Sequence, residues 1–239
     1  MLPKVSVTIA AYNCCPYIAQ AIDSVLSQDF PSFEIIVVND GSTDKTDKVL
    51  AGYRKNPLIR VINQKHYGQG WAKDRPVRAA RGKYIALFDA DDIMLPGRIN
   101  AQTEILDKHP SFGACYGKAK MVDLKLRPKK DKMFGREFGM HYRKSWDLIR
   151  IPIVPAALMF RKSIYQKTGG FDHSFNLSAD TDFMLKLAEK TRLYFLDEYL
   201  ILYRRRRGTA SHNKDIWQEE SRARKNAIER RYNFQATYL

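Results

Sequence analysis

Three aspartates stand within four positions of the chain, at Asp89, Asp91 and Asp92. They come directly after an apolar run, residues 84–88, which predicts a buried strand. A strand that ends in acids delivers them to the edge of a sheet, and ligands of open α/β sheets bind at the carboxyl ends of the strands. Because alternate residues of an extended segment point the same way, we expect Asp89 and Asp91 to share a side and Asp92 to point elsewhere.

Like charges this close repel one another unless a positive charge lies among them. A hard divalent cation such as Mg2+ or Mn2+ is the usual solution, and it often takes substrate phosphates as its remaining ligands. The aspartates therefore indicate a metal site. A plainer alternative is a solvated turn that leads into the next helix, which Pro96 is well placed to open.

The composition indicates a folded protein and leaves several classes of anionic partner open. The 239 residues are 44% hydrophobic, and their net charge of +15 favours nucleic acid, an anionic membrane surface or phosphorylated substrates. No apolar run approaches the roughly 20 residues that span a bilayer, and the chain starts without a signal peptide's apolar core, so we expect a cytoplasmic protein. Cys14, Cys15 and Cys115 fit no disulfide pattern or zinc site, which predicts reduced structural thiols.

The first part of the chain alternates between strand and helix. We predict strands at 5–10, 34–38, 60–62 and 84–88, and helices at 18–26, after Gly41 with Ser42 or Thr43 as the cap, and at 69–80 with Gly82 marking the end. This order predicts an α/β fold with a mostly parallel, Rossmann-like sheet flanked by helices. The turn after the first strand, Asp40 and the aspartate cluster then lie on one edge.

The sequence also excludes two common nucleotide sites. It has no Gly-x-Gly-x-x-Gly after the first strand and no phosphate loop. Asp40, at the end of the second strand, could bond a ribose hydroxyl or a base, or could simply form the turn before Gly41.

The second part is less regular. We predict helices at 95–108, 162–168 (closed by Gly169 and Gly170) and 215–232, and strands within 112–126, as part of a hairpin, and 191–203. Residues 127–144 are predicted to be a mobile loop, and 151–155 an extended segment. Asp180 and Asp182 begin an apolar helix, where acids complement the helix dipole.

Four segments in this order resemble the motifs of the family 2 glycosyltransferases, which have the GT-A fold. They are residues 6–13, 37–44 and 82–92, and the pair 169–172 and 179–182. The resemblance covers about residues 5–211. It implies one integrated domain, with a nucleotide-sugar-binding half at 1–95 and a smaller acceptor-binding half at 96–239.

The resemblance also implies a function. An inverting enzyme would move a sugar, a hexosyl or N-acetylhexosaminyl group, from a nucleotide sugar, usually a UDP-sugar, to a carbohydrate, lipid-linked or glycolipid acceptor, with Mn2+ or Mg2+ as cofactor. Asp40 would hold the base, Asp89 would approach the nucleotide, Asp91 would bind the metal with Asp89 as a second ligand, and Asp180 would be the catalytic base. The implied donor contacts are completed by Ala10, Ala11, Tyr12, Asn13, Lys73, Ala90, Arg204 and Arg206.

These implied roles are chemically consistent. A metal neutralises the charge that develops on the diphosphate leaving group, and fixed cations add to this effect. A positioned carboxylate takes the proton of the acceptor hydroxyl, which is worth about 10^2 to 10^4 in rate.

Three positions depart from the family pattern. Ala179 stands where a Glu often precedes the base, Lys73 stands where an Arg is usual, and Arg206 stands where a metal-binding His is often found. His212 lies nearby and could replace that His, or an arginine could bind the diphosphate directly. A catalytically inactive GT-A scaffold that binds nucleic acid or membrane is therefore the alternative function, although the clustered acids argue against a nucleic-acid partner.

The basic C-terminal part has two interpretations. Arginines fill positions 204–207 and recur along 215–232 beside apolar anchors such as Trp217. A peripheral helix on an anionic inner membrane surface has this composition. So does a helix that packs on the domain and keeps a solvated basic face.

Overall fold

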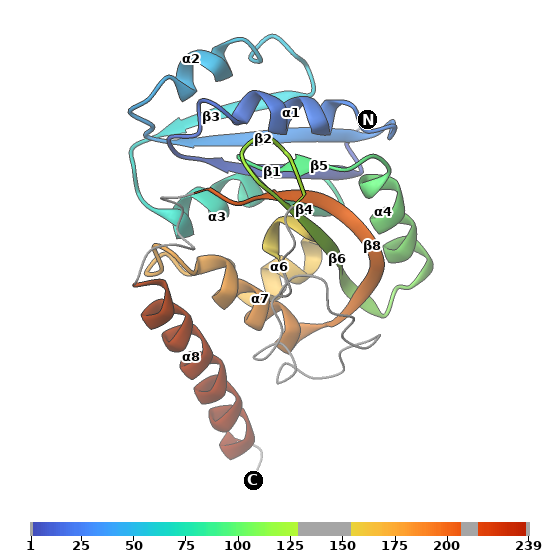
Figure 1. The fold of residues 1–239 in the computed structure, drawn as a ribbon. Helices are drawn as coiled ribbons and strands as arrows, with labels where there is room; N and C mark the ends of the chain where they lie inside the picture. The colour runs from blue at the N-terminus through green and yellow to red at the C-terminus, as the bar shows by residue number, and fades with distance from the viewer. Residues whose placement is uncertain (1, 129–153, 207–214, 238–239) are drawn as a thin grey trace.

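The computed structural model describes residues 2–128, 154–206 and 215–237 (Figure 1). Eight strands form one sheet in the order β3-β2-β1-β4-β7-β6-β8-β5. The strands are β1 (Val5–Ala11), β2 (Phe33–Asp40), β3 (Ile59–Gln64), β4 (Tyr84–Asp89), β5 (Ile93–Met94), β6 (Phe112–Val122), β7 (Leu158–Arg161) and β8 (Arg192–Arg204). The helices are α1 (Ile18–Leu26), α2 (Thr46–Ala51), α3 (Gln69–Ala79), α4 (Arg98–Lys108), α6 (Lys162–Thr168), α7 (Ala179–Lys190) and α8 (Ile216–Thr237), with a 3-10 turn at Pro155–Ala157.

The sheet is largely parallel, as the alternation of elements predicts. Strands β3, β2, β1 and β4 run parallel, and β6 runs parallel to β8, whereas β7 and β5 pair in the antiparallel sense. The register aligns Ala10 with Val38 on one side and with Asp89 on the other. The carboxyl ends of three strands are therefore level, and Asp40 and Asp89 emerge at the same edge.

Apolar layers cover both faces of the sheet. Strand β2 is buried along its whole length, with Ile35 and Val37 facing one layer and Ile36 the other, as a central parallel strand requires. Helices α1, α2 and α4 contribute to the first layer, and α3, α6, α7 and α8 to the second. Both layers combine side chains from before and after residue 95, so one core joins the two parts of the chain.

A buried arginine braces the sheet beneath the aspartate cluster. Arg98, on α4, is fully buried and donates to the carbonyl of Leu87 at 3.0 Å and to Gln102 Oε1 at 3.0 Å. Gln102 in turn donates to the carbonyls of Cys115 and Ala157. Burial lowers the pKa of Arg98 to about 9, although the nearby Asp92 opposes this shift. This polar group connects α4 to β4, β6 and the 3-10 turn.

The predicted cap of one helix and the predicted first residue of another are wrong, for a physical reason in each case. Ser42 and Thr43 do not cap α2, because both bond Asn13 in the turn after β1, and α2 starts only at Thr46. The helix predicted at 95–108 is α4, which begins at Arg98 instead of residue 95, after Gly97 in the left-handed conformation. The N–H of residue 95 donates to β8, which keeps this segment out of the helix.

Other expectations in the second part of the chain have mixed outcomes. Strand β6 lies inside the sheet between β7 and β8, and the predicted hairpin is limited to an antiparallel bridge between Val122 and Pro128 at the end of this strand. Helix α6 ends at Gly169 (φ 76°), as predicted. Pro155 opens a 3-10 turn where extended chain was predicted. Residues 129–153, which hold most of the predicted loop and the start of that segment, lie outside the described residues.

The three cysteines are free thiols, as predicted. Cys14 and Cys115 are buried, and burial raises the pKa of each to about 12. Their thiols therefore stay protonated at neutral pH and act as small apolar side chains.

The basic helix α8 packs along α7 on the second layer (Figure 1). Ala223 and Ala227 are buried in the contact, and Arg222 lies 4.0 Å from the centre of the Phe175 ring. Several basic side chains of α8 are thus used to dock the helix. In the ranges that the structure describes, no helix has the length and apolar character needed to span a bilayer.

Two glycines with the same left-handed backbone conformation allow a test of how closely the backbone segments approach one another at the site edge. A Cβ on Gly41 (φ 68°) would lie 2.5 Å from the backbone N of His66, whereas one on Gly169 (φ 76°) would meet nothing within 4 Å. Gly169→Ala should cost about 1 kcal/mol, for the left-handed backbone alone. Gly41→Ala adds a backbone clash and should cost about 2–4 kcal/mol in urea unfolding. Equal losses in the two variants would contradict this close approach.

Candidate functional site

A buried lysine joins two of the predicted acids. Lys73 Nζ, on α3, lies 3.2 Å from Asp89 Oδ1 at the end of β4 and 3.1 Å from Asp180 Oδ2 at the start of α7. Burial alone would lower the pKa of Lys73, but the charges of Asp180 and Asp89 outweigh it and raise that pKa above its ordinary value. The ammonium therefore stays charged and holds together carboxylates that are 91 positions apart in the chain.

A second cation contacts Asp91. Arg206 Nε, just after β8, lies 2.6 Å from Asp91 Oδ2. Burial and the charge of Asp89 raise the pKa of Asp91, and Arg206 opposes this shift. The two predicted metal ligands are thus close enough to repel one another, and each contacts a cation in this structure.

Asp92 differs from the other two acids in its burial, and residues 90–92 form a turn instead of the extended segment on which the predicted alternation rested. It is buried, and its Oδ1 accepts a hydrogen bond from the backbone N–H of Arg204 at 2.9 Å. Burial, with the charges of Asp91 and Asp89, raises its pKa well above the ordinary value. Asp92 therefore connects the aspartate cluster to the end of β8, from which Arg206 reaches Asp91.

Asp40 is buried and organises the turn between β3 and α3. Its carboxylate accepts hydrogen bonds from Gln64 Nε2 at 2.6 Å and from the backbone N–H groups of Tyr67 at 3.0 Å and Gly68 at 3.1 Å. His66 Nδ1 lies 2.8 Å from Asp40 Oδ2, the oxygen that also accepts the hydrogen bond from Gly68. The Asp40 side chain thus fixes a loop at the predicted base end of the site.

His66 and Tyr67 were missed by the sequence analysis. The ring of His66 stacks on Tyr12 with 4.1 Å between centroids, and Tyr12 is 43% exposed. An exposed aromatic pair of this kind offers a flat surface for a planar ligand. The available signal was the position of His66 and Tyr67 directly after β3, at the same edge as Asp40.

The remaining predicted donor contacts are also near this edge. Ala10 and Ala11 end β1, and Ala90 is buried beside Asp89. Asn13 adopts a positive φ of 48°, and its Oδ1 accepts hydrogen bonds from the N–H groups of Thr43 and Asp44. This arrangement fixes the turn that carries Tyr12.

The two predicted arginines differ in position. Arg204 is buried, donates to Gln20 Oε1 at 2.8 Å and lies 4.8 Å from the centre of the Tyr17 ring. Among the described contacts, the Arg206 side chain pairs with Asp91, whereas Arg204 contacts Asp92 through its backbone N–H. His212, the other candidate for the family's metal-binding His, lies outside the described residues.

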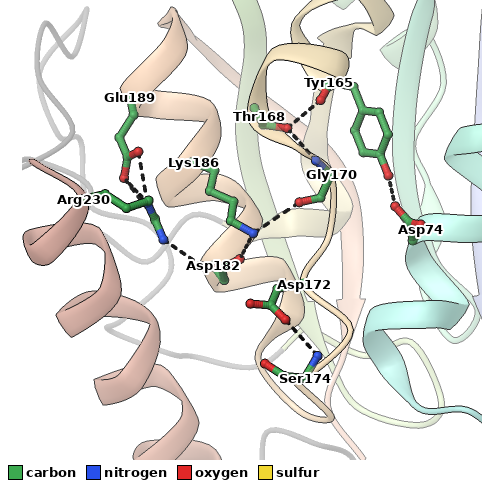
Figure 2. A network of polar contacts seen from close by, with 10 residues as sticks. All are labelled: Asp74, Tyr165, Thr168, Gly170, Asp172, Ser174, Asp182, Lys186, Glu189 and Arg230. Carbon is green, nitrogen blue, oxygen red and sulfur yellow. Dashed lines mark hydrogen bonds and ion pairs between the residues drawn. The ribbon is translucent and has the colours of Figure 1, made fainter. Parts of the chain in front are cut away.

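Asp180 and Asp182 have different surroundings. Asp182 is fully buried, its carboxylate lies 2.6 Å from Lys186 Nζ, and Arg230 of α8 reaches it at 3.5 Å (Figure 2). Arg230 also binds Glu189 at 2.9 Å. Asp182 thus belongs to the packing of α7 on α8, whereas Asp180 points to Lys73.

The turn before Asp180 is held by a residue that the sequence analysis missed. The Glu219 carboxylate, on α8, accepts hydrogen bonds from the backbone N–H groups of Asn176 at 3.1 Å, Leu177 at 2.8 Å and Ser178 at 3.0 Å. The N–H of Ala179 donates to Gln69 Oε1 at 3.0 Å. Helix α8 thereby fixes the start of α7, and with it the direction of Asp180.

The donor set fits a divalent cation that brings ligands of its own. Among the described residues, no three His, Cys, Asp or Glu side chains are arranged to hold a metal. Asp89 and Asp91 supply hard carboxylate oxygens, and Mg2+ in proteins is often bound by one or two carboxylates together with substrate phosphates. The two aspartates therefore suit a cation that arrives with a diphosphate.

Comparisons with known proteins agree with this geometry. The family model described as "Glycosyl transferase family 2" matches residues 6–169. A chondroitin synthase of Escherichia coli is 31% identical over 189 residues, which cover 79% of this chain and 27% of the synthase. An uncharacterized glycosyltransferase of Rickettsia prowazekii is 30% identical over 209 residues, covering 83% of this chain and 63% of that protein.

Solved structures match the fold. Staphylococcus aureus TarS 1-349 in complex with UDP-GlcNAc superimposes with a TM-score of 0.73 at 22% identity, over 90% of this chain and 64% of the 1-349 chain. A mannosyltransferase of Pyrobaculum calidifontis in complex with GDP-Man and Mn2+ gives a TM-score of 0.65 at 19% identity, over 87% of this chain and 59% of that one. These similarities confirm the predicted GT-A fold. The family model matches more than half of the length of this chain, so the chain belongs to glycosyl transferase family 2.

Proposed function

We propose that this protein transfers a sugar from a nucleotide-sugar donor to a hydroxyl acceptor, with inversion at the anomeric carbon. The observation that carries the proposal is the Lys73 bridge, which sets Asp180 and Asp89 on either side of one ammonium group at the carboxyl ends of the strands. Family membership supports the reaction class, and the UDP-GlcNAc complex of TarS supports a UDP-sugar donor. The similarity to a chondroitin synthase favours an acceptor that is a carbohydrate chain or a lipid-linked precursor of one.

On the donor side, the chain's own residues bind and orient the nucleotide. The stacked rings of Tyr12 and His66 and the loop fixed by Asp40 form the base end. Asp89 and Asp91 would hold a divalent metal, which when bound neutralises charge on the leaving diphosphate. Arg206, which contacts Asp91, adds a positive charge beside these two acids.

On the acceptor side, Asp180 acts as the base. The acceptor oxygen attacks the anomeric carbon, the bond from that carbon to the diphosphate oxygen breaks, and the diphosphate leaves with the electron pair. The Asp180 carboxylate takes the hydroxyl proton. One carboxylate suffices for a single displacement of this kind, and Lys73 together with the turn held by Glu219 keeps it in place.

The acidic residues can be tested separately for binding and turnover. Purified protein should melt at a higher temperature with one class of nucleotide sugar, among UDP, GDP, CDP and dTDP sugars, because ligands stabilise the native state by mass action. Asp91→Asn should abolish the metal-dependent part of this shift. Asp180→Asn should keep the shift but lower kcat about 10^2- to 10^4-fold.

Glu104→Gln is the matched control for these variants, because Glu104 pairs only with Lys108 on the surface of α4 among its described contacts. It should change neither the melting shift nor kcat. A wild-type protein that melts at the same temperature with every donor, with and without metal, would overturn the proposal.

The role of α8 in positioning Asp180 gives a second prediction. Glu219→Ala removes the acceptor of three backbone N–H groups, so it should lower the free energy of unfolding by about 1–3 kcal/mol. It should also lower kcat about ten- to hundredfold, with little change in the KM for the donor, because Asp180 loses its fixed direction.

Its neighbour Glu220 pairs with Arg224 on the same helix, and such pairs contribute little. Glu220→Ala should therefore leave both kcat and stability nearly unchanged. A Glu219→Ala enzyme with wild-type kcat at a temperature where it is fully folded would show that the turn does not position the base.

A further inference from the structure

Arg206 contacts the aspartate that is expected to bind the metal. Its Nε lies 2.6 Å from Asp91 Oδ2, and both side chains are mostly buried, at 23% and 18% exposure. An ion pair of this length in a partly desolvated site is a strong charge-assisted contact. A divalent cation that binds Asp91 through Oδ2 would have to displace Arg206 from that oxygen.

The chain holds Arg206 near Asp91 from a fixed point. The N–H of Arg204 donates to Asp92 Oδ1 at 2.9 Å, and the N–H of Arg205 donates to the carbonyl of Val122 at 2.9 Å. The backbone is thus anchored one and two residues before Arg206. The long side chain of Arg206 can change partner over a few ångströms while its backbone stays in place.

Lys73 differs from Arg206 in this respect. It lies between two carboxylates at 3.2 and 3.1 Å, and its side chain is only 10% exposed. Removing Lys73 would break two ion pairs at once, and its ammonium lies on a less exposed side chain than the guanidinium of Arg206, so its loss of both partners is costly. Of these two cations, Arg206 is the one that can leave its carboxylate at lower cost.

We propose that Arg206 is an exchangeable counter-ion of the active site. It neutralises Asp91 before the donor binds, gives up that carboxylate to the divalent cation, and then binds the donor's diphosphate. The inference rests on the proposed function for the identity of its second partner. The planar guanidinium suits both partners, since it can form paired hydrogen bonds to carboxylate or phosphate oxygens.

The exchange couples metal binding to nucleotide binding. A metal ion that binds alone must break the Arg206–Asp91 contact, with no diphosphate present to take the place of Asp91. When the diphosphate is present, Arg206 gains that partner, so the same metal binds more tightly. By linkage, the metal strengthens nucleotide binding by the same factor.

The test measures Mn2+ binding directly, with the full chain and no turnover. Free Mn2+ is followed by electron paramagnetic resonance during titration of the wild type and Arg206→Gln, first alone and then with saturating UDP. Without UDP, Arg206→Gln should bind Mn2+ about tenfold more tightly, because Asp91 is no longer occupied. With UDP, this advantage should disappear, and the Kd of UDP in the presence of Mn2+ should rise about tenfold, a coupling within the usual range.

Three control variants separate the effect from general charge loss. Arg205→Gln removes the same charge from the adjacent exposed side chain and should leave the Mn2+ affinity without UDP unchanged. Arg206→Lys keeps the charge and should fall between the wild type and Arg206→Gln. Asp91→Asn should weaken Mn2+ binding in either background. Thermal melting of each variant confirms that it is folded.

The outcomes distinguish this inference from the proposed function. If Arg206→Gln binds Mn2+ no more tightly than the wild type, or neither protein binds Mn2+, the exchange is overturned. If Arg206→Gln weakens UDP binding equally with and without Mn2+, Arg206 is a simple diphosphate contact and the exchange is likewise overturned. If the wild type binds Mn2+ but no nucleotide, the proposed function fails, while the titration without UDP still decides whether Arg206 and the metal compete for Asp91.

Discussion

The arrangement of the site depends on one buried ammonium group. Two unit charges 4 Å apart interact by about 4 kcal/mol at the effective dielectric constant of a protein surface. Acids from the end of β4 and the start of α7 could not stay close together at that cost without a cation. Lys73 supplies it from α3, and its contacts with Asp89 and Asp180 join the predicted donor side to the predicted acceptor side. The fold can therefore bring these two acids together before any metal or substrate arrives.

A second set of charges, on α7 and α8, holds these two helices together. Arg230 binds Glu189 and reaches the buried Asp182, which also pairs with Lys186, so that α8 is held along the length of α7 (Figure 2). At the other end of α8, Glu219 accepts three hydrogen bonds from the turn before Asp180. Part of the chain's large positive charge is thus used internally, to fix the helix that carries the predicted base.

The sequence predicted the parts of this structure that depend on local patterns. Hydrophobic periodicity located β1, β2, β4 and α1, and parallel topology predicted that Asp40 and Asp89 would emerge at one edge. Prediction from local patterns failed where a side chain had two possible partners. Ser42 was a reasonable helix cap from its residue type, but its hydroxyl accepts a hydrogen bond from the N–H of Asn13, which is 29 positions away in the chain. The role of Glu219 could not be predicted at all, because no local pattern indicates which turn a surface glutamate on a basic helix will meet.

The departures from the family pattern are connected in the structure. Ala179 has only a methyl side chain, which cannot orient a neighbouring base by hydrogen bonding, and it is fully buried in the second layer. The positioning of Asp180 then falls to groups from other elements: Lys73 at its carboxylate, Gln69 at the N–H of Ala179, and Glu219 at the turn before it. Because an ammonium can contact two acids that do not share a plane, a lysine at position 73 suits this bridge better than a flat guanidinium would. Arg206, beside Asp91, supplies a guanidinium to the site, and its planar group suits paired bonding to oxyanions.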